Sequence, residues 1–138
     1  MAQISIWFVR AALIHFLMGV TVGAWGLAAK SGLWPPFPLP ARPFHVELVL
    51  VGWLCQLAVG VALWILPFSR SVSRDRRFWS AWGLLNGGVL LVVFGKGDPF
   101  LPAYVLGRLL EATAGGLLVW GLWPRLRPLP RRGHRSER

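Results

Sequence analysis

Four long apolar blocks occupy most of this 138-residue chain. They run from Ile4 to Ala29, from Phe44 to Leu66, from Phe78 to Phe94 and from Ala103 to Trp123. Each is close to the ~20 apolar residues that an α-helix needs to cross ~30 Å of hydrocarbon. Only helices and closed barrels satisfy their backbone polar groups in lipid. The blocks therefore predict an all-α integral membrane protein, a bundle of four helices.

The composition supports this interpretation, because 55% of the residues are hydrophobic and nine are Trp, more than a soluble domain usually carries. Residues 1–124 are predicted to form the transmembrane domain. The first block is longer than the ~7–15 apolar residues of a secretory signal core, so we interpret it as a retained helix. Residues 125–138 are rich in Arg and Pro and bury too little apolar surface to fold. We expect them to form a basic, disordered cytoplasmic tail.

Positive charge is concentrated beside two of the blocks, and the net charge is +10. The two clusters are Arg70, Arg74, Arg76 and Arg77, and Arg125, Arg127, Arg131, Arg132, Arg135 and Arg138. Because short cytoplasmic loops are enriched in Lys and Arg, both clusters and both chain termini are expected in the cytoplasm. The charge favours contact with anionic lipid. Nucleic acid is not an expected partner, since no base-reading fold accompanies the charge.

Polar side chains inside the blocks fall into two groups by depth. Uncompensated polar groups are costly in a bilayer, so they face the bundle interior or mark a site. At ~1.5 Å of rise per residue, His15, Gln56 and Asn86 lie near the middle of the membrane. We interpret this middle group as hydrogen-bonded residues rather than metal ligands.

The outer group comprises His45, Glu47, Arg108 and Glu111. Arg108 and Glu111 are three residues apart, so they can pair on one helix face. Two interpretations remain open. The group is either an interhelical ion-pair network that stabilises the bundle, or a site for a proton path, a quinone head or the carboxylates of a cofactor.

Glycines recur along the blocks at spacings that allow helix backbones to approach closely in lipid. They are Gly19 and Gly23, Gly83 and Gly87, and Gly107, Gly115 and Gly116. We expect them to pack the bundle tightly. The alternative is that one glycine face seats a flat cofactor.

One segment of the second block carries a more specific pattern. It reads Arg42-Pro-Phe-His45-Val-Glu47, continues through Gly52-Trp53 and Gly60, and closes at Pro67. The segment resembles the second transmembrane helix of the catalytic subunits of nitric oxide reductases and cbb3-type oxidases, members of the haem-copper oxidase superfamily. It is also similar to small four-helix bacterial proteins that look like a fragment of oxidase subunit I.

The resemblance implies that His45 is an axial ligand of haem b, a role that suits a neutral imidazole. Arg42 and Arg108 would then pair with the haem propionates. Two departures limit what is implied. A second histidine of the small proteins falls at Glu47, and the later helices that carry further haem and copper ligands in the large enzymes have no counterpart here. Independent reduction of oxygen or nitric oxide is therefore not expected.

The second axial position of such a haem is left open. His15 and His45 are predicted to differ in depth by well over ~10 Å, counted at ~1.5 Å per residue, so one iron cannot bind both. In a homodimer, each chain would contribute its His45 and the haem would carry electrons. In a five-coordinate haem, the open face would bind a gas.

Our leading hypothesis is a small oxidase subunit I-like protein of the bacterial inner membrane that binds haem b beside a respiratory or nitric oxide-handling complex. The alternative is a cofactor-free structural or accessory subunit in which Glu47, Arg108 and Glu111 form ion pairs. In either case the expected partners are membrane lipid and a second copy or a larger membrane complex.

Catalysis by the chain alone is not expected, because the sequence has no nucleophile with a base, no metal-ligand cluster and no phosphate-binding glycine loop. A transporter that uses Glu111 as a proton carrier is disfavoured, since four short helices show no obvious inverted repeat.

Overall fold

The computed structural model describes residues 3–38, 40–65, 75–95 and 101–125, and these form four long helices without a strand. The first is α1 (Gln3–Lys30), and the second runs through α2 (Ala41–Glu47), η1 (Leu48–Cys55) and α3 (Gln56–Ile65). The others are α4 (Arg76–Phe94) and α5 (Leu101–Leu122), the latter followed by the single turn η3 (Trp123–Arg125). All four are long and apolar enough to cross a membrane. The predicted all-α, four-helix membrane fold is confirmed.

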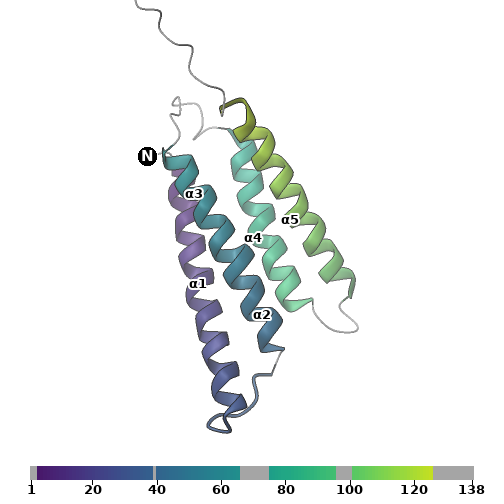
Figure 1. Cartoon of the computed structure of the whole chain (residues 1–138). Helices are drawn as coiled ribbons and strands as arrows, with labels where there is room; N and C mark the ends of the chain where they lie inside the picture. Colours follow the sequence, from purple (N-terminus) through teal and green to yellow (C-terminus); the bar gives the residue numbers. More distant parts are fainter. Residues whose placement is uncertain (1–2, 39, 66–74, 96–100, 126–138) are drawn as a thin grey trace, which may run out of the picture.

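The helices form two antiparallel hairpins that lie side by side (Figure 1). In one hairpin α1 packs along the second helix, and in the other α4 packs along α5. The start of α1 and the end of α5 lie at the same end of the bundle. Which side of the membrane this end faces stays a prediction, and residues 126–138 of the predicted tail lie outside the described part of the chain.

Glycines bring α1 and the second helix together at four levels. The contacts pair Gly23 with His45, Gly19 with Val49, His15 with Gly52 and Val9 with Gly60. A Cβ atom at any of these glycines would lie 2.8 Å or less from a partner side chain. At the last level the Ser5 hydroxyl also donates a hydrogen bond of 2.7 Å to the Gly60 carbonyl. The close packing of this hairpin therefore requires glycine at these positions.

The α4–α5 hairpin is closer still, because backbone meets backbone. A Cβ atom on Gly107 would lie 2.9 Å from both the Gly88 carbonyl oxygen and the Val92 amide nitrogen. Such contacts require glycine on both helices. The predicted packing role of Gly19, Gly23 and Gly107 is thus confirmed.

Other glycines have a different environment from the one we expected. Gly83, Gly87, Gly115 and Gly116 have open space where a Cβ atom would be, with no described atom within 4 Å. They therefore do not bring helices together within the described bundle. Sequence spacing alone did not distinguish these outward glycines from the inward ones.

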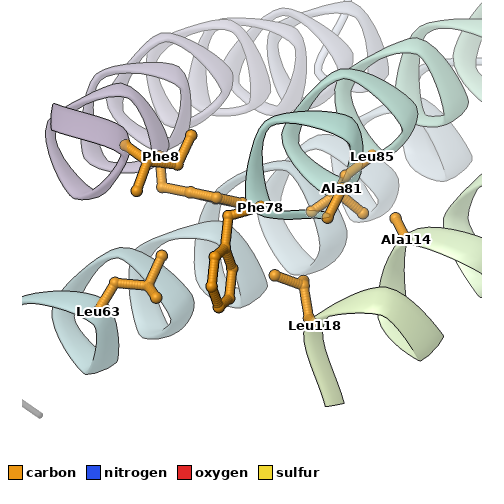
Figure 2. Packing of buried hydrophobic residues seen from close by; sticks show 8 residues of the cluster. Phe8, Leu63, Phe78, Ala81, Leu85, Ala114 and Leu118 are labelled. Carbon is orange, nitrogen blue, oxygen red and sulfur yellow. The ribbon is translucent and has the colours of Figure 1, made fainter. Parts of the chain in front are cut away.

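The buried cluster that contains Phe78, near the start of α4, includes residues of all four helices. Figure 2 shows Phe78 among the buried side chains of its cluster, which are Ile4, Phe8, Leu63, Ala81, Leu85, Ala114 and Leu118. A second cluster at the other end of the bundle contains Val22, Phe44, Leu48, Val89 and Val93. Each cluster contains residues from both hairpins, so the hairpins are held together at both ends.

Two helix starts differ from the predicted blocks. α4 begins at Arg76 rather than Phe78, because the Asp75 carboxylate accepts a hydrogen bond of 3.1 Å from the Arg77 amide and so caps the helix. The second helix begins at Ala41, three residues before Phe44. Proline is tolerated in a first helical turn, so Pro43 does not prevent this earlier start.

Residues 48–55 form a π-helix between α2 and α3, which the apolar pattern did not predict. Such wider turns inside α-helices are rare and often occur near functional sites. Here the π-helix follows Glu47 and contains Gly52, which contacts His15. It changes which face of the helix the later residues occupy.

We expect Gly107→Ala to destabilise the protein by about 1–3 kcal/mol, because the added methyl group meets backbone atoms that a side-chain rotation cannot move. Gly115→Ala is the matched control. It faces open space, and Ala is up to ~1 kcal/mol better than Gly in a helix, so this variant should be as stable as the wild type or more so. Thermal unfolding in detergent measures both. Equal melting temperatures for the two variants would contradict the close contact.

Candidate functional site

A cavity of about 470 Å³ lies between α1 and α2, near the ends that residues 31–40 connect. Its lining consists of Val20, Gly23, Ala24, Gly26, Leu27, Lys30, Ala41, Arg42 and His45. Most of these side chains are small or apolar, whereas Lys30 and Arg42 contribute positive charge and His45 contributes an imidazole. The cavity thus combines an apolar wall with two cations and one imidazole.

The ring of His45 is held in a defined tautomer. Its Nδ1 atom lies 2.8 Å from the Gly19 carbonyl oxygen, and because a carbonyl only accepts, Nδ1 must carry the proton. In the neutral ring Nε2 then has a free lone pair, and the bond to Gly19 is the hydrogen bond that the ring forms with the described residues. Metal-binding histidines are usually oriented by the same bond from the other ring nitrogen. Gly23 allows the ring this position, since a Cβ atom there would lie 2.5 Å from Nδ1.

These residues fit a haem better than a bare metal ion. Among the described residues no group of three or more His, Cys, Asp or Glu side chains could hold a metal. A haem iron takes its equatorial ligands from the porphyrin and needs only axial ligands from protein. One imidazole in an apolar, cationic cavity meets that requirement.

Arg108 does not line this cavity, although the resemblance implied a role for it beside a cofactor. Its guanidinium instead binds Glu47 of α2 through both of the carboxylate oxygens, one of them at 2.9 Å. The same group donates a hydrogen bond of 2.7 Å to Oε2 of Glu111. Lys30, which we did not predict, is the second cation at the cavity. Lys30 ends α1, and residues 31–40 connect it to the helix that carries Arg42. This position is the sequence signal that could have identified Lys30.

Glu47, Arg108 and Glu111 therefore form an interhelical triad, separate from His45. The Glu47 and Glu111 side chains are 5% and 10% exposed. The predicted pairing of Arg108 with Glu111 on one face of α5 is confirmed. Tyr104, one turn earlier on α5, adds a contact of 3.4 Å between its hydroxyl and Arg108 Nε.

One atom of the triad has no partner. The Oε1 atom of Glu111 is buried and forms no hydrogen bond with any described residue. Gly88 of α4 makes room for this side chain, because a Cβ atom there would lie 2.8 Å from Glu111 Cγ. Neither Gly88 nor Tyr104 was identified from the sequence.

The middle group forms a hydrogen-bonded network that joins three helices. Gln56 Nε2 donates to His15 Nδ1 and to Asn86 Oδ1, both at 3.2 Å. Asn86 Nδ2 donates back to Gln56 Oε1 at 3.3 Å and to the Trp82 carbonyl at 2.7 Å. The interpretation of these residues as hydrogen-bonding partners is confirmed.

The chain matches no protein-family model, no curated protein and no solved structure. The oxidase resemblance of residues 42–67 therefore stays a prediction. The assignment of a function depends on the geometry of the cavity and of the triad.

We expect Arg108→Leu to destabilise the protein by roughly 3–5 kcal/mol, because it leaves the buried Glu47 carboxylate without its cation. Arg77→Leu is the control, since Arg77 forms an exposed ion pair with Asp75, a kind that contributes about 1 kcal/mol or less. Thermal unfolding in detergent compares the two.

A double variant, Glu47→Gln with Arg108→Gln, should recover part of the lost stability, because the Glu47 carboxylate is removed together with the guanidinium and only Glu111 is left unpaired. Unfolding curves for Arg108→Leu that coincide with those for Arg77→Leu would show that the triad does not stabilise the bundle.

Proposed function

We propose that this protein binds haem b in the cavity between α1 and α2, with His45 as an axial ligand, and acts in electron transfer or gas binding beside a respiratory or nitric oxide-handling complex. The observation that carries the proposal is the position of His45. Its Nδ1 is bonded to the Gly19 carbonyl, its Nε2 has no partner among the described residues, and it lines a cavity with two cations.

The chemistry of the cavity lining supports the binding of a planar, amphipathic anion. Small residues of α1 leave space beside the helix, and apolar side chains suit the macrocycle. Arg42 and Lys30 would hold the propionates through charge-assisted hydrogen bonds. This assignment keeps the predicted role of Arg42 and gives the role predicted for Arg108 to Lys30.

His45 contributes orientation and basicity. The bond from Nδ1–H to the Gly19 carbonyl prevents rotation of the ring and makes the free nitrogen a stronger donor. Haem b, when bound, supplies a one-electron ferric–ferrous couple or an open position for a gas.

His15 does not supply the opposite ligand in this proposal. It lies eight residues from Gly23, the glycine that His45 contacts, or ~12 Å along α1 at 1.5 Å per residue. Its Nδ1 also accepts the Gln56 bond. Opposite His45, the proposal therefore leaves either His45 of a second chain or an open face.

A cofactor-free accessory subunit is the second candidate. It is favoured by the triad of Glu47, Arg108 and Glu111, which joins the two hairpins without a cofactor. This candidate predicts a colourless protein that co-purifies with a larger membrane complex.

We expect protein purified in mild detergent from haem-replete cells to show a Soret band and, after reduction with dithionite, sharp α and β bands. His45→Ala should lose these bands, because the iron loses its ligand, and added imidazole should restore part of them. Arg42→Gln and Lys30→Gln should weaken haem retention. Arg10→Gln, a cation of α1 outside the cavity lining, is the matched control.

A featureless spectrum of the wild-type protein would refute the haem assignment and favour the accessory subunit. Unchanged bands in His45→Ala would refute the ligand assignment alone.

A further inference from the structure

The triad in the membrane-spanning bundle contains one more carboxylate than cation. Two carboxylates, Glu47 and Glu111, share the single guanidinium of Arg108. From α4 the triad meets the glycine at position 88, and from α5 it meets the uncharged Tyr104. His45 is two residues from Glu47 but is bonded to α1. With both carboxyl groups ionised, the described groups would leave one uncompensated negative charge.

An uncompensated charge inside a bilayer is costly, and two carboxylates that share a site disfavour each other's ionisation. One bound proton removes the excess charge. The two carboxyl groups differ in where such a proton could reside. Both oxygens of Glu47 accept hydrogen bonds from Arg108, so neither is free. Glu111 accepts only at Oε2, and its buried Oε1 has no partner in the described structure.

A line of polar side chains follows one face of α5 and ends at the other oxygen of this carboxyl group, Oε2. Tyr104, Arg108 and Glu111 follow one another at spacings of four and three residues, which align side chains on a helix. The Tyr104 hydroxyl contacts Arg108 Nε, and Arg108 contacts Glu111. Glu111 is ten residues from Leu101, where α5 begins, or ~15 Å at 1.5 Å per residue. A polar line thus leads from the helix start to the carboxyl group.

We propose that Glu111 is a proton-binding site in the membrane, where Oε1 holds one exchangeable proton that reaches it along the Tyr104–Arg108 face of α5. Uptake combines the Glu111 carboxylate with a proton from water and gives the neutral acid. Release returns the proton and leaves a carboxylate that competes with Glu47 for Arg108. The site is independent of haem binding.

The test uses the whole protein in detergent and dicyclohexylcarbodiimide, an apolar reagent that modifies protonated carboxyl groups. The acid proton moves to a nitrogen of the reagent while the carboxyl oxygen adds to its central carbon, so no atom is lost and an ionised carboxylate does not react. Mass spectrometry locates the adduct. We expect one adduct, on Glu111, whose rate of formation falls as the pH rises, because the reactive acid is then depopulated.

Variants separate the proton site from general accessibility. Glu111→Gln should abolish the adduct. Glu47→Gln should lower the labelling of Glu111 several-fold, because one carboxylate then balances one guanidinium and the proton is no longer needed. Asp75→Asn removes a carboxylate outside the triad and should leave the labelling unchanged.

An adduct on another carboxyl group, or wild-type labelling in Glu47→Gln, would overturn the proposal. Protection of Glu111 by Na⁺ would overturn it as well, since the site would then hold a metal ion. If Glu111→Gln does not fold, the location of the wild-type adduct and the Glu47→Gln comparison still decide the outcome. Neither measurement requires bound haem.

Discussion

Close approach of antiparallel helices at glycine is the interaction on which both candidate sites depend. Lipid provides no hydrophobic driving force between helices, so dispersion and hydrogen bonds at short range hold them together. In the first hairpin, Gly23 allows the His45 ring to lie against α1 and to donate to the Gly19 carbonyl. In the second, the contact of Gly88 with Gly107 brings α4 close to Glu111. A larger side chain at these positions would separate the helices and the polar groups with them.

The polar groups of the bundle are nearly all paired with one another, as a bilayer requires. Gln56 and Asn86 exchange amide hydrogen bonds, and Arg108 serves two carboxylates. Among the described residues of the two candidate sites, Nε2 of His45 and the buried Oε1 of Glu111 form no hydrogen bond with the protein. A polar group at membrane depth that lacks a partner is expensive and usually functional. The proposed haem ligand and the proposed proton site are these two atoms.

The sequence predicted which residues matter better than it predicted how they are grouped. His45 and Glu47 were placed in one outer group because they enter the membrane at the same depth. Two positions apart on an α-helix means ~200° of rotation, so they point to different neighbours: His45 to α1 and Glu47 to α5. Arg108 therefore lies with Glu47, away from the cavity. Lys30 is the second cation at the cavity in its place. Depth can be counted along a chain, but facing depends on how the helices are arranged around one another.

The sequence by itself determined the four spans and the i,i+3 pairing of Arg108 with Glu111. It also determined that the middle group of His15, Gln56 and Asn86 is hydrogen-bonded. These follow from span length, helical periodicity and the cost of polar groups in lipid, which are local or solvent properties. Only the tertiary structure decided which glycines face a partner, where the π-helix of residues 48–55 turns the later residues, and that one oxygen of Glu111 is left without a bond. The glycine contacts and the unpartnered oxygen are relations between helices, about which spacing within one helix carries no information. The π-helix is a change of hydrogen-bond pattern within one helix, and an apolar sequence pattern does not specify it.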